Sequence, residues 1–137
     1  MIRLWRTQRG SAALEFALVF PVFLMFTFGL FATYSLISCK RAMEYGIEKA
    51  LRAGVTNSSG GATAVTSAYA TAAGKIWPSV GSGSSVSASF SSATGTNILS
   101  VTATYTWTAP AGLNGALSNS IFNAVTLSAG GSMRVAN

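Results

Sequence analysis

The stretch Arg9–Phe23, RGSAALEFALVFPVF, decides how the chain is organised. It places one carboxylate, Glu15, at the entrance to a long apolar run, five residues after Gly10. The residues before Gly10, MIRLWRTQR, include three arginines and no acid, a pattern typical of an export or membrane-insertion signal. A charge inside a membrane costs about 2.5–3.5 kcal/mol at the helix centre and less near the interface. Glu15 is therefore expected at the membrane edge, with a partner for its charge.

The apolar run is long enough to cross a membrane. No charge occurs over the 22 residues from Phe16 to Ile37, and six of the eight phenylalanines lie between Phe16 and Phe31. A helix of that length spans about 33 Å, against about 30 Å for the hydrocarbon core. The alternative, a core helix of a soluble protein, is rarely apolar on every side for so long. A transmembrane helix is predicted over residues 11–39, with Pro21 as either a kink or a tolerated early-turn proline.

Composition disfavours catalysis and nucleic-acid binding. The 137 residues include nine Lys and Arg, three acids and no His, for a net charge of +6. Phosphate-tracking grooves need clustered, uncompensated cations, whereas the basic residues after the apolar run are interleaved with acids. Acid–base catalysis, nucleophilic catalysis and metal binding need sets of residues that cannot be assembled here. The prediction is no enzyme, no cofactor, no metal and no nucleic-acid partner.

Residues 40–78 are predicted to form a helical stalk and a second helix. The stalk continues the transmembrane helix and is expected to stop at Gly54, before a loop over 57–61. The second helix runs from Ala62 to Trp77, where Pro78 ends it. Its apolar face, interpreted as a packing surface, comprises Val65, Ala68, Tyr69, Ala72 and Ile76.

Residues 79–137 are predicted to form a small β-rich head. After a Gly/Ser linker at 80–84, apolar and polar residues alternate through Val86–Phe90 and, most clearly, through Asn97–Thr108. A hairpin turn at 94–97 joins these strands. A connection over 110–123 leads to the last strand.

The last strand, from Val125, is predicted to be bulged at Gly130–Gly131. Three antiparallel strands with one apolar face need a cover, for which the second helix is the candidate. The predicted fold class is therefore α+β: a long N-terminal transmembrane helix that continues into a stalk, and a second short helix packed on a three-stranded antiparallel sheet.

Both ends of the chain resemble the TadE-like minor pilins, or pseudopilins, of tight-adherence (Tad/Flp) pili. The N-terminal resemblance lies in Arg9, Gly10, Ala13–Phe16, Pro21 and the run to Phe31. The C-terminal resemblance lies in Val101–Trp107, Leu127–Ala129 and Ser132–Arg134. Family members often carry a further acid after the glycine that matches Gly29. Leucine, phenylalanine and alanine stand there instead, so any role of that acid does not transfer.

The resemblance implies a prepilin leader over residues 1–10, which a prepilin peptidase cuts between Gly10 and Ser11. It also implies that Glu15, Phe16 and Pro21 serve recognition and assembly. A carboxylate at Glu15 could pair with the new amine of Ser11, in its own or a neighbouring subunit, and so set the axial register. The alternative is that Glu15 only snorkels to the interface.

The implied location is the bacterial inner membrane, spanned once, with a cytoplasmic N-terminus and the head in the periplasm, outside the cell or in the pilus. The charges flanking the span do not decide this orientation. The implied partners are the prepilin peptidase, other pilin subunits and the assembly platform of a type IV-like pilus. The alternative is an exported, membrane-anchored adhesin or a lipoprotein acylated at Cys39, which ends the lipobox-like sequence Leu36–Cys39. The Ser/Thr-rich strand face fits subunit contact, adhesion or simple solvation.

Overall fold

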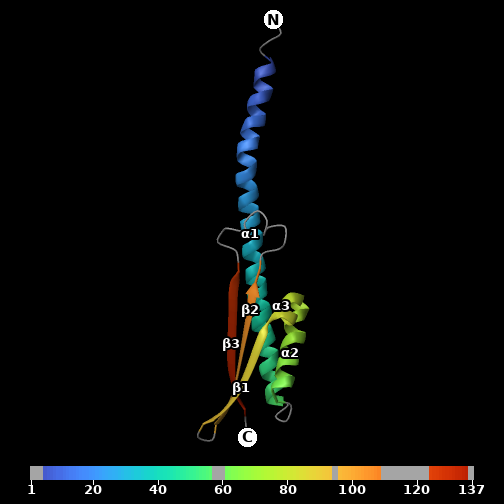
Figure 1. Cartoon of the computed structure of the whole chain (residues 1–137), viewed down its shortest axis with the longest axis vertical. Helices are drawn as coiled ribbons and strands as arrows, with labels where there is room; N and C mark the ends of the chain where they lie inside the picture. Colours follow the sequence, from blue (N-terminus) through green and yellow to red (C-terminus); the bar gives the residue numbers. More distant parts are fainter. Residues whose placement is uncertain (1–4, 57–60, 94–95, 109–123, 136–137) are drawn as a thin grey trace. The chain divides into compact units, whose positions relative to one another are not determined.

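The computed structural model describes residues 5–56, 61–93, 96–108 and 124–135. In these residues, three helices precede three strands (Figure 1). The elements are α1 (Trp5–Thr56), α2 (Gly61–Ile76), α3 (Pro78–Gly83), β1 (Ser85–Ala93), β2 (Thr96–Trp107) and β3 (Val125–Val135). The predicted α+β class is confirmed. The chain divides into two compact units, Met1–Ser35 and Leu36–Asn137.

The sheet of the second unit is an antiparallel meander in the order β1-β2-β3. The β1–β2 ladder closes with Ala93 opposite Thr96, so the predicted hairpin is confirmed, while its turn at 94–95 lies outside the described residues. In β2 the predicted alternation holds. The buried residues of this strand are Leu99, Val101, Ala103 and Trp107. Threonines occupy the opposite, exposed face at 102, 104 and 106.

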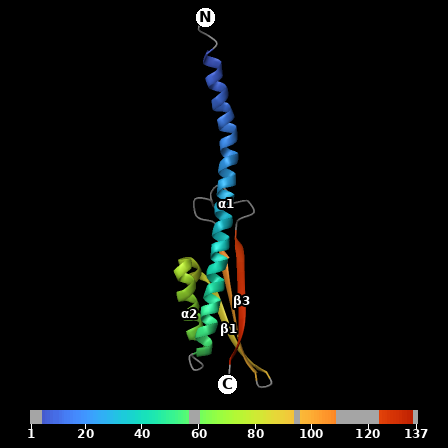
Figure 2. The same cartoon turned by 180° about the vertical axis from the view of Figure 1, so that it is seen from behind.

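Residues 36–56 of α1 lie between α2 and the sheet (Figures 1 and 2). A Cβ on Gly54 would overlap with Cδ2 of Leu99 in β2 and would lie 3.0 Å from Cγ2 of Val65 in α2. A Cβ on Gly131 in β3 would meet Leu51 Cδ1 at 3.0 Å. Helix α2 contacts β1, as expected of a cover. The sequence analysis missed that α1 also covers β2 and β3.

Gly54 does not stop the helix, because α1 continues to Thr56. The glycine is required instead for the close approach of α1 to Leu99. The loop predicted at 57–61 falls mostly outside the described residues, and Gly61 is already the first residue of α2. Gly61 has φ of +55°, a left-handed value that glycine adopts without steric cost.

The second helix is confirmed, with small changes to its buried face. Val65, Tyr69 and Ala72 are buried as predicted, and Ala73 joins them. Ile76, predicted to be part of this face, is 46% exposed at the C-terminal end of the helix.

The linker predicted at 80–84 is wrong, because Pro78–Gly83 form the short helix α3. Pro78 occupies the start of this helix, and Trp77 before it is extended at φ −143° and ψ 102°, as a residue preceding proline prefers. Val80 is fully buried, which anchors the helix.

The bulge predicted in β3 is also wrong. Gly130 and Gly131 stand in regular register opposite Thr102 and Val101. Gly131 is on the inner face, where an added Cβ would lie only 3.0 Å from Leu51 Cδ1 and 3.1 Å from Ile47 Cγ2 of α1. The connection predicted at 110–123 lies outside the described residues.

Candidate membrane and assembly segment

All five predicted site residues lie on the single helix α1. Gly10 and Ser11 have helical backbone, Glu15 and Phe16 are exposed, and the helix continues through Pro21. Positions four apart lie on the same face of a helix, with Cβ atoms about 5–6 Å apart. Residues 11 and 15 are therefore neighbours on α1. The helical backbone itself brings these two predicted residues together.

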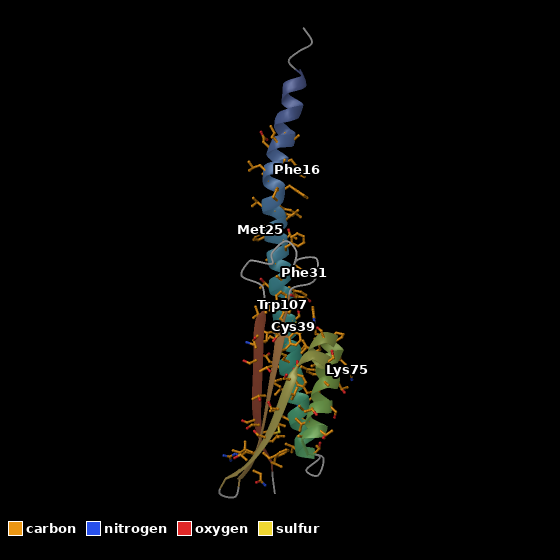
Figure 3. The ribbon with its side chains drawn as sticks, in the orientation of Figure 1. Phe16, Met25, Phe31, Cys39, Lys75 and Trp107 are labelled. Atoms are coloured by element: carbon orange, nitrogen blue, oxygen red, sulfur yellow. The ribbon has the colours of Figure 1, made fainter. Side chains whose placement is uncertain are left out.

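The first unit presents apolar side chains in all directions. From Ala12 to Phe31, every side chain is exposed or half-exposed. Leu18 is 75% exposed, Phe26 67% and Phe31 54%. Figure 3 shows Phe16, Met25 and Phe31 projecting from the helix. Within the described residues, α1 is the one helix that is long and apolar enough to cross a membrane.

Two threonine hydroxyl groups of the first unit have acceptors within the helix. Thr27 Oγ1 donates to the carbonyl of Phe23, and Thr33 Oγ1 donates to the carbonyl of Gly29, both at 2.9 Å. Such internal bonds are what a hydrocarbon environment requires of a polar group. Pro21 has no N–H, so it cannot donate to the carbonyl of Ala17.

The predicted assembly residue Phe16 contacts another aromatic residue one turn later. The rings of Phe16 and Phe20 stack with centroids 5.3 Å apart and an interplanar angle of 26°. Both side chains remain exposed, at 67% and 44%. The pair therefore forms an aromatic surface on α1, available to a lipid or to a second helix.

Beyond residue 36, α1 has one buried and one charged face. On the exposed face Arg52 forms an ion pair with Glu48, one turn away. The ammonium group of Lys49 lies 5.4 Å from the centroid of the Tyr45 ring. Exposed pairs of this kind contribute about 0.2–1 kcal/mol to stability, so they are a minor part of what stabilises this helix.

The buried face of this part of α1 is lined mainly by small residues. Cys39, Ala42, Met43 and Ala50 are fully buried. A Cβ on Gly46 would lie 2.8 Å from Cδ2 of Tyr69. Cys39, Ala42, Gly46 and Ala50 are spaced three or four residues apart, and this spacing could have predicted the close packing of α1 against the head. Figure 3 shows Cys39 and Trp107 at the same end of this unit.

A hydroxyl-rich depression lies beside α2. It is lined by Thr63, Thr66, Ser67, Tyr69, Ala70, Gly81, Ser84 and Val86. The Tyr69 hydroxyl donates to Ser84 Oγ at 3.1 Å, and burial raises the pKa of Tyr69. Among the residues with described positions, no three His, Cys, Asp or Glu side chains form a group that could hold a metal ion.

Comparisons with curated proteins and with solved structures gave no match. A comparison with protein-family models matched residues 10–52 to the TadE-like protein family. The matched segment begins at Gly10 and contains Glu15, Phe16, Pro21 and the whole apolar run. It confirms the resemblance inferred from these residues. Residues 10–52 are thus similar to the TadE-like protein family.

Proposed function

We propose that this chain is a minor pilin or pseudopilin that takes part in assembly of a tight-adherence pilus. The observation that carries the proposal is the apolar segment from Phe16 to Phe31, in which every residue is exposed or half-exposed and which directly follows Glu15. Such a surface needs lipid or neighbouring apolar helices around it. A pilin meets both environments, first in the inner membrane and then in the filament.

The proposed maturation step is hydrolysis of the peptide bond between Gly10 and Ser11 by a prepilin peptidase. It removes residues 1–10 and gives Ser11 a free amine. The carboxylate of Glu15, one helical turn away, can then pair with this amine or with that of a neighbouring subunit. In apolar surroundings a wrong stagger would leave a charge without its partner, so the pair favours one register.

The remaining parts follow from this anchor. Residues 11–39 are the proposed transmembrane portion, residues 40–78 the stalk and second helix, and residues 79–137 the exported head. Helix packing joins the stalk and head into one unit, as the contact of Gly54 with Leu99 illustrates. The proposed role is non-enzymatic: the head caps, primes or decorates the filament. The proposed partners are the peptidase, other pilin subunits and the assembly platform.

The lipoprotein alternative requires Cys39 to become an acylated N-terminus. Cys39 lies in the middle of α1, and its side chain is fully buried. Cleavage before Cys39 would also separate the head from the apolar segment that the family match includes. These observations favour the pilin over the lipoprotein.

Mass spectrometry of the membrane-extracted protein tests the proposal. The wild-type chain should begin at Ser11, and Gly10→Leu should retain residues 1–10. Gly29→Leu is the matched control, because a Cβ at Gly29 meets no atom within 4 Å and processing should continue. Normal processing of Gly10→Leu, or an acylated Cys39, would contradict the proposed cleavage.

A second experiment tests assembly separately from cleavage. Glu15→Gln keeps the size of the side chain but removes its charge. The variant should begin at Ser11 yet yield far fewer pili than the wild type. The matched control, Glu44→Gln, removes a charge from the stalk and should leave pilus yield unchanged. Equal pilus yields from all three proteins would exclude the proposed role of Glu15.

A further inference from the structure

Lys40 and Arg41, the first two cations after the apolar segment, are exposed. In the described part of the chain, neither makes an ion pair or an aromatic contact. Glu44, on the next turn, is also exposed and pairs with neither. The sequence has only three acidic residues, so few carboxylates exist that could neutralise these cations. By contrast, Arg52 and Lys49 each have a partner on α1.

The position of these cations along α1 matches the surface of a membrane. The uncharged run from Phe16 to Ile37 has 22 residues and spans about 33 Å as a helix, against about 30 Å for the hydrocarbon core. Tyr34, in the last turn of this run, is 67% exposed, and tyrosine is enriched at membrane interfaces. Lys40 is the third residue after Ile37, about 5 Å further along the helix, and a headgroup layer is about 5–7 Å thick. Helical side chains tilt toward the N-terminus, so both cations lean back toward the membrane.

We propose that Lys40 and Arg41 bind the phosphate groups of anionic phospholipids on the side of the membrane that holds the second unit. The planar guanidinium of Arg41 suits two oxygens of one phosphate, and the ammonium of Lys40 acts as a point charge. Such contacts fix the depth of α1 and limit its rotation in the bilayer. The inference rests on the membrane insertion that the proposed function includes.

Nuclear magnetic resonance of the full chain in bicelles tests this contact at a single residue. The Nε–Hε signal of Arg41 should shift and saturate as phosphatidylglycerol replaces phosphatidylcholine. The signal of Arg52, which is paired with Glu48, is the internal control and should shift little. Lys40→Gln should weaken the apparent affinity at Arg41 about fivefold, the effect of one cation near an anionic surface. Lys49→Gln, the matched variant, should leave that affinity unchanged.

Amide hydrogen exchange in the same bicelles separates two failures. Protection of residues 12–31 shows that α1 is inserted. If these amides exchange freely, both the membrane anchor and the lipid contact are overturned. If they are protected but Arg41 responds no more than Arg52, or if both lysine variants have the same effect, only the lipid contact is overturned.

Discussion

Gly74 in α2 and Gly81 in α3 are in contact, yet the same substitution should have opposite effects at the two positions. A Cβ on Gly81 would lie 2.6 Å from the carbonyl oxygen of Ala70 and 2.7 Å from the backbone nitrogen of Gly74. A Cβ on Gly74 would have its nearest contact at 3.8 Å, with the Cα of Gly81. The first contacts are with backbone, which cannot rotate away. The second is an ordinary van der Waals distance.

These distances set the expected changes in the free energy of unfolding. Gly74→Ala should stabilise the head by about 0.5–1 kcal/mol, because alanine loses less conformational entropy than glycine in a helix. Gly81→Ala should destabilise it by about 1–3 kcal/mol, the usual cost of an overpacked site. Helix α3 would have to move away from α2 and disturb the buried side chain of Val80. The two variants should therefore differ by about 1.5–4 kcal/mol.

Urea unfolding of the detergent-solubilised full chain measures this difference. Tryptophan fluorescence is a suitable signal because Trp107 is only 3% exposed. Gly29→Ala is the control for an added methyl group, since its Cβ meets open space. The reasoning is refuted if Gly81→Ala is as stable as the wild type, or if Gly74→Ala is destabilised as much as Gly81→Ala.

Two further predictions concern the core of the head. Burial raises the pKa of Tyr69 above its unfolded value of about 10, so its contribution to stability is complete below about pH 10 and is lost as the pH rises through the folded pKa. Tyr69→Phe should lose about 1 kcal/mol at neutral pH and show a shallower alkaline decline in urea unfolding than the wild type; parallel pH curves would contradict this. Leu99→Ala should cost about 2–5 kcal/mol in the same assay, because Leu99 is fully buried beneath Gly54. Met133→Ala, on the adjacent strand at 36% exposure, is its control, and equal losses would show that Leu99 is not in the core.

Local pattern predicted the elements whose own residues determine them. The alternation through Asn97–Thr108 identified β2 and its buried face, and the alanine-rich stretch before Pro78 identified α2. The apolar run identified α1, while Gly10 and Glu15 pointed to the family that the comparison found. These features are visible within one element and need no knowledge of its neighbours.

The errors arose where glycine serves a contact between elements. Gly54 was interpreted as a helix stop and Gly131 as part of a bulge, although both make room for the packing of α1 on the sheet. Residues 80–84 were interpreted as a linker from their Gly/Ser content, whereas Gly81 permits the close contact of α3 with α2. In the sequence, a glycine looks the same whether it serves a turn, a bulge or a close contact between two elements. Only the position of the neighbouring element distinguishes them.

The hydroxyls of Thr27 and Thr33 have a consequence for movement between environments. Since each donates to a carbonyl of its own helix, the segment keeps these two hydrogen bonds wherever it goes. If the segment moved from lipid into a bundle of protein helices, neither hydroxyl would need a new hydrogen-bond acceptor. The preference of the segment for lipid or for protein helices would then depend mainly on how well its phenylalanine rings pack in each environment. The carbonyl of Ala17 differs, because it accepts no hydrogen bond from Pro21. A hydrogen-bond donor on a neighbouring molecule would therefore favour one orientation of that neighbour beside Ala17.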